Sequence, residues 1–195
     1  MTDMEQPNRT VTQGVQRMTP SEAFVETMVA QGVTDIFGIV GSAYMDALDI
    51  FPAAGIRFIP VAHEQGAVHM ADGYARVSGR HGVCIGQNGP GVTNFVTGVA
   101  AAYWAHSPVV MITPETGSMT MGLGGFQETE QLPIFSKITK YQGHVMNPKR
   151  IAEITARCFA RAAGSCPPPP PPPPPPPRAP RSSLILAAIS SSLAF

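Results

Sequence analysis

Short apolar runs alternate with segments of helical periodicity about five times in this chain. The runs that we expect to form strands are 35–40, 56–62, 82–86, 108–113 and 140–145. Between most of them lie segments whose apolar residues recur at spacings of three and four, as in an amphipathic helix. This order predicts an α/β fold in which a parallel sheet has helices on both faces. The run 108–113 is almost wholly apolar, which predicts a central strand buried on both sides.

Residue types at the expected helix ends support this assignment. Thr19 and Glu22 form a capping box with Pro20 at the first helical position, which predicts a helix that ends at Gly32. Asn147 and the proline after it predict the start of the last helix. Helices are also expected over 44–51, from about 64, and over 92–105.

Charge and cysteine content exclude several classes of function. Thirteen basic and thirteen acidic residues give no net charge, and no basic block supports nucleic-acid binding. Three scattered cysteines fit a reducing cytoplasm better than a disulfide framework. The polar segment 1–17 is no secretory signal, and the apolar end 184–195 is too short to span a bilayer. We therefore expect a cytoplasmic protein that does not act on membranes.

The chain divides into three parts by composition. Residues 1–17 are expected to be disordered, 18–164 to form one domain, and 165–195 to be a disordered, proline-rich low-complexity tail. Eleven consecutive prolines, 167–177, would form a polyproline II rod of roughly 34 Å, and we expect this rod to be no part of the packed domain. The tail is typical of GC-rich DNA translated in a wrong frame, so a frameshifted gene fragment is one hypothesis. A natural truncation, with the prolines as a linker or a ligand for another domain, stays open.

The segment VAHEQGAVHMADGYAR, residues 61–76, passes from the end of an expected strand into a helix, with Glu64 at the joint. Open α/β sheets bind ligands at that edge, and a helix dipole favours a negative charge there. Glu64 is therefore either a ligand-binding residue or an acid that only helps its helix to start.

Two further segments carry candidate residues. Gly89-Pro90-Gly91 is either a plain turn or a place where a flat ligand approaches the backbone, and Asn94 could add a hydrogen bond. Phe126-Gln127 follows a glycine-rich loop and is either surface or substrate-facing.

The five histidines show no metal-ligand spacing, so no metal site is expected in this chain. His106 is the kind of lone histidine that is more often structural than catalytic.

Together, HEQ, MADGYAR and the later GPG resemble the N-terminal pyrimidine-binding (PYR) domain of thiamine-diphosphate-dependent enzymes over about residues 18–164. The resemblance implies that Glu64 is catalytic and hydrogen-bonds N1′ of the aminopyrimidine of thiamine diphosphate. It further implies cofactor contacts from Glu64, Gly89, Pro90, Gly91 and Asn94. A buried carboxyl group can hold and release a proton near neutral pH, which glutamine cannot do.

Three longer segments are FGIVGSAYMDALDIF, QNGPGVTNFVTGVAAAYWAHSPVVMITP and GGFQETEQ. They resemble the sulfoacetaldehyde acetyltransferase family most, and acetolactate synthases next. The first resemblance implies conversion of sulfoacetaldehyde and phosphate to acetyl phosphate and sulfite, and the second implies a 2-oxo acid substrate. By the same resemblance, His63, His106, Phe126 and Gln127 are candidate substrate contacts.

No GDG motif occurs in the sequence, although these enzymes hold Mg²⁺ and the diphosphate through a GDG…N motif in another domain. Complete members are homodimers or tetramers with the cofactor between subunits. We therefore expect the isolated chain to be inactive. An alternative is a non-catalytic binding module that pairs with a separately encoded diphosphate-binding domain.

Overall fold

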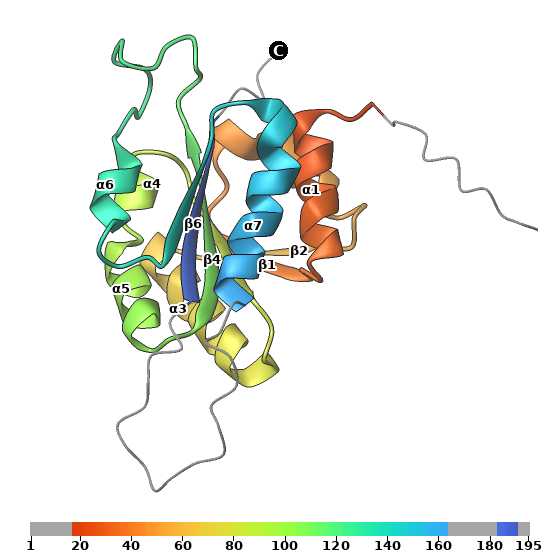
Figure 1. Cartoon of the computed structure of the whole chain (residues 1–195), viewed down its shortest axis with the longest axis vertical. Helices are drawn as coiled ribbons and strands as arrows, with labels where there is room; N and C mark the ends of the chain where they lie inside the picture. The colour runs from red at the N-terminus through yellow and green to blue at the C-terminus, as the bar shows by residue number, and fades with distance from the viewer. Residues whose placement is uncertain (1–16, 164–182, 191–195) are drawn as a thin grey trace, which may run out of the picture.

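The computed structural model describes residues 17–163 and the backbone of residues 183–190 (Figure 1). Six strands form one parallel sheet in the order β2-β1-β3-β4-β6-β5. They are β1 (Asp35–Gly38), β2 (Arg57–Pro60), β3 (Gly82–Ile85), β4 (Pro108–Glu115), β5 (Tyr141–Val145) and β6 (Ser183–Ser190). The predicted α/β class with a parallel sheet is confirmed.

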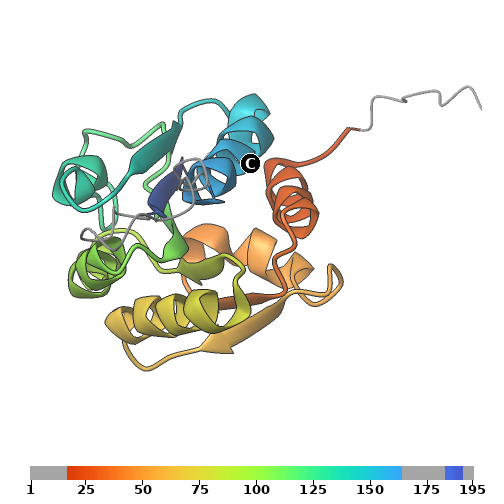
Figure 2. The same ribbon diagram turned by 60° about the horizontal axis from the view of Figure 1, so that its bottom comes forward.

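Helices cover both faces of the sheet, as predicted (Figure 2). They are α1 (Pro20–Ala30), α2 (Met45–Ile50), α3 (Glu64–Ser78), α4 (Pro90–Thr93), α5 (Val96–Trp104), α6 (Gln131–Phe135) and α7 (Ile151–Ala163), with 3-10 turns η1 (Ser42–Tyr44) and η2 (Pro148–Arg150). α1, α2 and α7 share one core with alternate strand residues such as Val110, and α3, α5 and α6 share the other with residues such as Met111. None of the helices in the described part of the chain is long and apolar enough to cross a membrane.

The capping box at the start of α1 forms as predicted. The Thr19 backbone N–H donates to Glu22 Oε2 at 2.7 Å, and the Glu22 N–H donates to Thr19 Oγ1 at 3.2 Å. These two bonds satisfy N–H groups that have no partner within the helix. The helix ends at Ala30, and Gly32 takes a positive φ of 75°, which fits the predicted stop.

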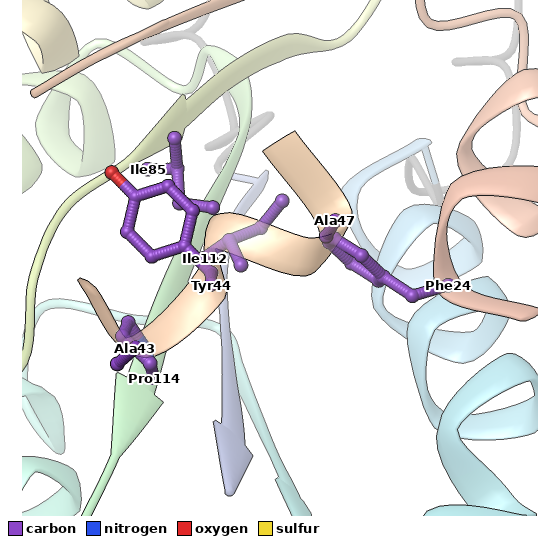
Figure 3. A pocket seen from close by; sticks show the side chains of 7 residues that line it. All are labelled: Phe24, Ala43, Tyr44, Ala47, Ile85, Ile112 and Pro114. Atoms are coloured by element: carbon purple, nitrogen blue, oxygen red, sulfur yellow. The ribbon is translucent and has the colours of Figure 1, made fainter. Parts of the chain in front are cut away.

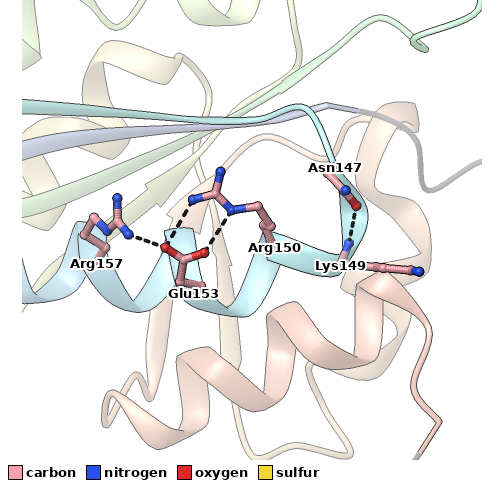
Figure 4. A network of polar contacts seen from close by, with 5 residues as sticks. All are labelled: Asn147, Lys149, Arg150, Glu153 and Arg157. Atoms are coloured by element: carbon pink, nitrogen blue, oxygen red, sulfur yellow. Dashed lines mark hydrogen bonds and ion pairs between the residues drawn. The ribbon is translucent and has the colours of Figure 1, made fainter.

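The last helix also begins where the sequence predicts. Asn147 Oδ1 accepts a hydrogen bond of 3.0 Å from the Lys149 backbone N–H, and η2 then runs into α7 (Figure 4). On the exposed side of α7, Glu153 pairs with Arg150 at 2.9 Å and with Arg157. Water screens these exposed pairs, so packing of the buried face of α7 on the sheet holds the helix in place.

β4 is buried along nearly its whole length, as expected for a central strand. On one side it pairs with β3, and on the other it pairs with β6 over eight residues, from Pro108 opposite Ser183 to Glu115 opposite Ser190. β6 in turn pairs with β5. Residues 183–190, which the sequence assigns to the low-complexity tail, therefore form a strand of this sheet.

The physical reason for this difference is the run SLILAAIS, which has the length and apolar content of a buried parallel strand. The sequence analysis took it for part of the tail because the prolines precede it. Residues 1–16 of the predicted disordered segment 1–17, the polyproline run 167–177 and the last five residues lie outside the described residues.

Two local details differ from the sequence prediction. The helix expected over 92–105 divides into α4 and α5, because the Phe95 N–H donates to the Val92 carbonyl three residues back, at 3.1 Å. α6 was not predicted, because five residues with a proline at the third position show no helical periodicity. The division after α4 sets the direction of the Asn94 side chain.

Candidate functional site

The strand order creates a switch point at the carboxyl edge of the sheet. β2 lies on one side of β1 and β3 on the other, so the chain leaves β1 and β3 in opposite directions. Open α/β sheets bind ligands outside the carboxyl ends of strands at such a point. Segments 39–44, 61–64 and 86–91, which follow β1, β2 and β3, all start from this edge.

Glu64, the first residue of α3, is only 8% exposed. Its neighbour His63 caps the helix by accepting a 3.2 Å hydrogen bond at Nδ1 from the Gln65 backbone N–H. Asn94 Nδ2 donates to Glu64 Oε2 at 2.9 Å, while Oε1 has no hydrogen bond to any described residue. The carboxyl group is thus held at one oxygen, and the other is available to a ligand.

Two glycines make room for this carboxyl group. A Cβ at Gly86 would lie 2.8 Å from two ring atoms of Phe95 and 3.3 Å from Glu64 Cγ. A Cβ at Gly91 would lie 3.2 Å from Glu64 Oε1. Glycine is therefore required here by the protein's own side chains, before any ligand approaches.

Gly89 has a different role from Gly91. Its φ is +69°, and a Cβ there would lie 2.6 Å from the Gln127 carbonyl oxygen. Asn88 Nδ2 donates to the carbonyls of Phe126 and Gln127 at 3.1 and 3.2 Å. The turn after β3 thus anchors the loop that carries the two predicted substrate contacts.

Gln87 connects three loops, and the sequence analysis did not single it out. Its Nε2 donates to Asn88 Oδ1 at 2.6 Å and to Gln127 Oε1 at 3.2 Å, and its Oε1 accepts from the Ala43 N–H at 3.2 Å. The segment after β1, the turn after β3 and the loop at Gln127 are therefore bonded to one amide. The signal in the sequence was a polar residue directly after a buried strand.

Tyr44 is a second residue that the sequence analysis missed. It is buried, and its hydroxyl donates to the Ile39 carbonyl oxygen. Burial raises the pKa of Tyr44, and the negative charge of Glu64 raises this pKa further. Tyr44 is therefore neutral at physiological pH and adds no charge beside the carboxyl group.

The small cavity beside Tyr44 is apolar and has a volume of about 10 Å³ (Figure 3). Its walls come from β3, β4, α1 and the segment 43–47, and they include Ile85, Ile112 and Phe24. A space of this size is at the lower limit for a single water molecule, so it cannot hold a cofactor ring.

The structure brings most of the predicted site residues together, but not His106. The hydrogen bonds and close approaches above join Glu64, Gly91 and Asn94, and separately join Gly89 to Gln127. Pro90 is the first residue of α4, between the two glycines, and Phe126 is 77% exposed. His63 lies at the same edge, next to Glu64, with its side chain exposed.

His106 follows α5 and precedes the first residue of β4. All strands are parallel, so His106 lies at the amino edge of the sheet, opposite the end at which Glu64 follows β2. The predicted substrate contact from His106 is therefore corrected, because the length of the sheet separates it from the site.

Comparison with known proteins identifies the family of this domain. Residues 18–134 match the family described as "Thiamine pyrophosphate enzyme, N-terminal TPP binding domain". The chain belongs to this family. Sulfoacetaldehyde acetyltransferase from Alcaligenes xylosoxydans xylosoxydans is 75% identical over 155 residues, which are 80% of this chain and 26% of that protein. The protein of the same name from Castellaniella defragrans is 72% identical, over 82% of this chain and 27% of the relative.

A more distant relative is the probable acetolactate synthase large subunit of Methanocaldococcus jannaschii, 39% identical over 77% of this chain and 25% of its own length. The thiamine pyrophosphate enzyme domain of this chain is thus much more similar to the acetyltransferases. The chain spans about a quarter of the length of the curated relatives it matches.

The residues at the carboxyl edge fit the pyrimidine ring of thiamine diphosphate. The Glu64 carboxyl group is buried, and its Oε1 makes no hydrogen bond to a described residue, as a contact with a ring nitrogen requires. In the described part of the chain, no group of three or more His, Cys, Asp or Glu residues is arranged to hold a metal ion.

Proposed function

We propose that this domain holds the aminopyrimidine ring of thiamine diphosphate at the carboxyl edge of its sheet, with Glu64 as its catalytic residue. The observation that carries the proposal is the buried Glu64 carboxyl group, bonded to Asn94 at Oε2 and lying against Gly91 at Oε1. Oε1 would be the atom that holds and releases a proton toward the ring nitrogen N1′ when the cofactor is bound. Thiamine diphosphate supplies the carbanion chemistry when it is bound.

The other residues of the site orient Glu64 and close the site. Asn94 donates to Oε2 and so fixes the direction of the carboxyl group, which leaves Oε1 for the proposed contact with the ring. Gln87 and Asn88 hold the loop that carries Gln127 in place beside the turn after β3. Gln127 and the exposed Phe126 are the proposed substrate contacts, and His63 is a candidate beside Glu64.

For the complete enzyme we propose the reaction that the resemblance implies, conversion of sulfoacetaldehyde and phosphate to acetyl phosphate and sulfite. The much higher identity to the acetyltransferases than to the acetolactate synthase supports this substrate over a 2-oxo acid. Mg²⁺ and the diphosphate would be held by a second polypeptide region, in a dimer or tetramer.

The two halves of the cofactor provide a direct test of ring binding. The 195-residue chain is titrated with 4-amino-5-hydroxymethyl-2-methylpyrimidine and, separately, with the thiazole alcohol, and the side-chain amide signals of Asn94 are followed by NMR. We expect saturable shifts with the pyrimidine half only. Glu64→Ala should abolish the shifts, and Glu26→Gln, which changes an exposed carboxylate on α1, should leave them unchanged.

Equal binding of the thiazole half, or pyrimidine binding that survives Glu64→Ala, would refute the assignment of the ring site. A separate experiment tests the need for a second region. The purified chain with thiamine diphosphate, Mg²⁺, sulfoacetaldehyde and phosphate should release no sulfite. Sulfite release under these conditions would show that the chain needs no separate diphosphate-binding domain.

A further inference from the structure

A second hollow lies at the carboxyl edge, between the ends of β4 and β5 and the segment 128–133. Its volume is about 330 Å³, enough for a small organic group. Glu115, the last residue of β4, and His144 of β5 form part of its wall, with His144 Nε2 2.5 Å from Glu115 Oε2. None of the described residues that line it belongs to the proposed pyrimidine site.

Gln131 gives this cavity an unsatisfied acceptor. The residue lines the cavity and is only 2% exposed. Its Nε2 donates to the Pro114 carbonyl at 2.6 Å, which fixes the orientation of the amide, and its Oε1 has no hydrogen-bond partner in the described structure. A buried carbonyl oxygen without a donor is costly, so a ligand that brings a donor would be favoured.

The charges around the cavity define the ligand further. Three carboxylates, from Glu115, Glu128 and Glu130, line it, and His144 is the only basic residue among its described lining residues. Glu128 already accepts hydrogen bonds from backbone N–H groups of the glycine-rich loop, and Glu115 is paired with His144. The electrostatic potential in the cavity is therefore negative, and its polar lining atoms are mostly hydrogen-bond acceptors. Both features disfavour phosphate and sulfonate groups.

We propose that this cavity binds a cationic hydrogen-bond donor, a guanidinium or primary ammonium group, between Glu115, Glu130 and Gln131 Oε1. Such groups carry several N–H donors and no acceptor, so one group can satisfy a carboxylate and an amide oxygen together. The group can belong to a free amine or to an arginine or lysine side chain of another polypeptide. The ligand proposed for this cavity is therefore cationic, whereas the sulfonate and phosphate substrates proposed for the complete enzyme are anionic.

Isotope-labelled full-length chain is titrated with butylguanidinium and with Nα-acetyl-arginine amide, and the signals of the Gln131 amide and the His144 ring are followed by NMR. We expect saturable shifts at both residues. Glu130→Gln, at the exposed rim, and Glu115→Gln should each weaken binding about tenfold, equivalent to about 1.4 kcal/mol. The matched charge change Glu26→Gln, on α1, should have no effect.

The two cations identify the source of the group. Similar affinities indicate a small-molecule amine site, and a much tighter arginine amide indicates a side chain of another polypeptide. Binding that is equally strong in Glu130→Gln and Glu26→Gln would overturn the proposal, as would tighter saturation of the same signals by phosphate, ethanesulfonate or Mg²⁺. Because Glu130 is exposed, its variant decides the outcome even if Glu115→Gln fails to fold.

Discussion

Substitution of Gly98 by alanine tests how the site-bearing helix α3 is held. Gly98 lies in α5, and a Cβ there would be 2.6 Å from Val68 Cβ and 3.2 Å from the Gln65 carbonyl oxygen of α3. The position of Val68 Cβ is set by the backbone of α3, so no change of the Val68 rotamer relieves this contact. The added methyl group must push apart the two helices, and α3 begins at Glu64.

The magnitude follows from two opposing effects. Replacing a helical glycine by alanine gains about 1 kcal/mol, while overpacking a dense interior costs about 1–3 kcal/mol. Gly73→Ala is the matched control, because Gly73 lies in α3 and a Cβ there meets nothing within 4 Å. We therefore expect Gly98→Ala to be less stable than Gly73→Ala by about 1–3 kcal/mol in the free energy of unfolding.

Urea denaturation followed by circular dichroism measures both variants, with comparison of midpoints at equal slopes. A double-mutant cycle separates the steric effect from the propensity effect. In a Val68→Gly background the Val68 Cβ is absent, so the cost of Gly98→Ala relative to Gly73→Ala should largely disappear. If Gly98→Ala is as stable as Gly73→Ala in the natural background, the close contact between α3 and α5 does not constrain the site.

Three further predictions concern stability. Asn94→Ala removes the donor to Glu64 Oε2 and should lower the free energy of unfolding by about 1.5–3 kcal/mol, as for a hydrogen bond to a charged group. Urea denaturation measures this change, and an unchanged midpoint would contradict the 2.9 Å contact. Burial lowers the pKa of His81 below its ordinary 6.5, although its hydrogen bond to the Phe159 carbonyl opposes this. The unfolded chain then binds the proton more readily, so stability should fall as pH drops below about 6.5, and His81→Gln should flatten urea midpoints measured between pH 7 and pH 5. Leu186→Pro removes a backbone donor inside β6 and should destabilise the chain by about 3 kcal/mol or more, while Leu186→Val should not. Equal urea midpoints for the two variants would show that β6 contributes nothing to the fold.

Local sequence signals predicted the elements that depend on neighbouring residues. The capping box at Thr19, the cap at Asn147 and the junction at Glu64 are all short-range patterns, and each forms at the predicted place. β6 pairs with strands that lie about 40 to 75 residues earlier in the chain. No local sequence pattern indicates such a pairing. The prolines before it further concealed an ordinary apolar strand.

The same distinction explains which site residues were missed. Glu64 and the GPG turn stand out because their types and spacing are unusual, whereas Gln87 and Tyr44 are ordinary residues whose roles come from the strand order. Gln87 reaches Ala43 and Gln127 only because β1 and β3 are neighbours and the loop after β4 folds back over them. Sequence patterns show residues that perform chemistry more readily than residues that position them.

The glycines of the GPG turn show how closely site and fold depend on each other. At Gly91 the missing side chain leaves space for the Glu64 carboxyl group, and at Gly89 it leaves space for the Gln127 carbonyl. A ligand that reaches this turn therefore meets side chains already packed against the backbone, at positions fixed by folding. The proposed catalytic oxygen of Glu64 and the proposed substrate loop both lie against this one turn, so a substitution in the turn should alter both before any cofactor binds.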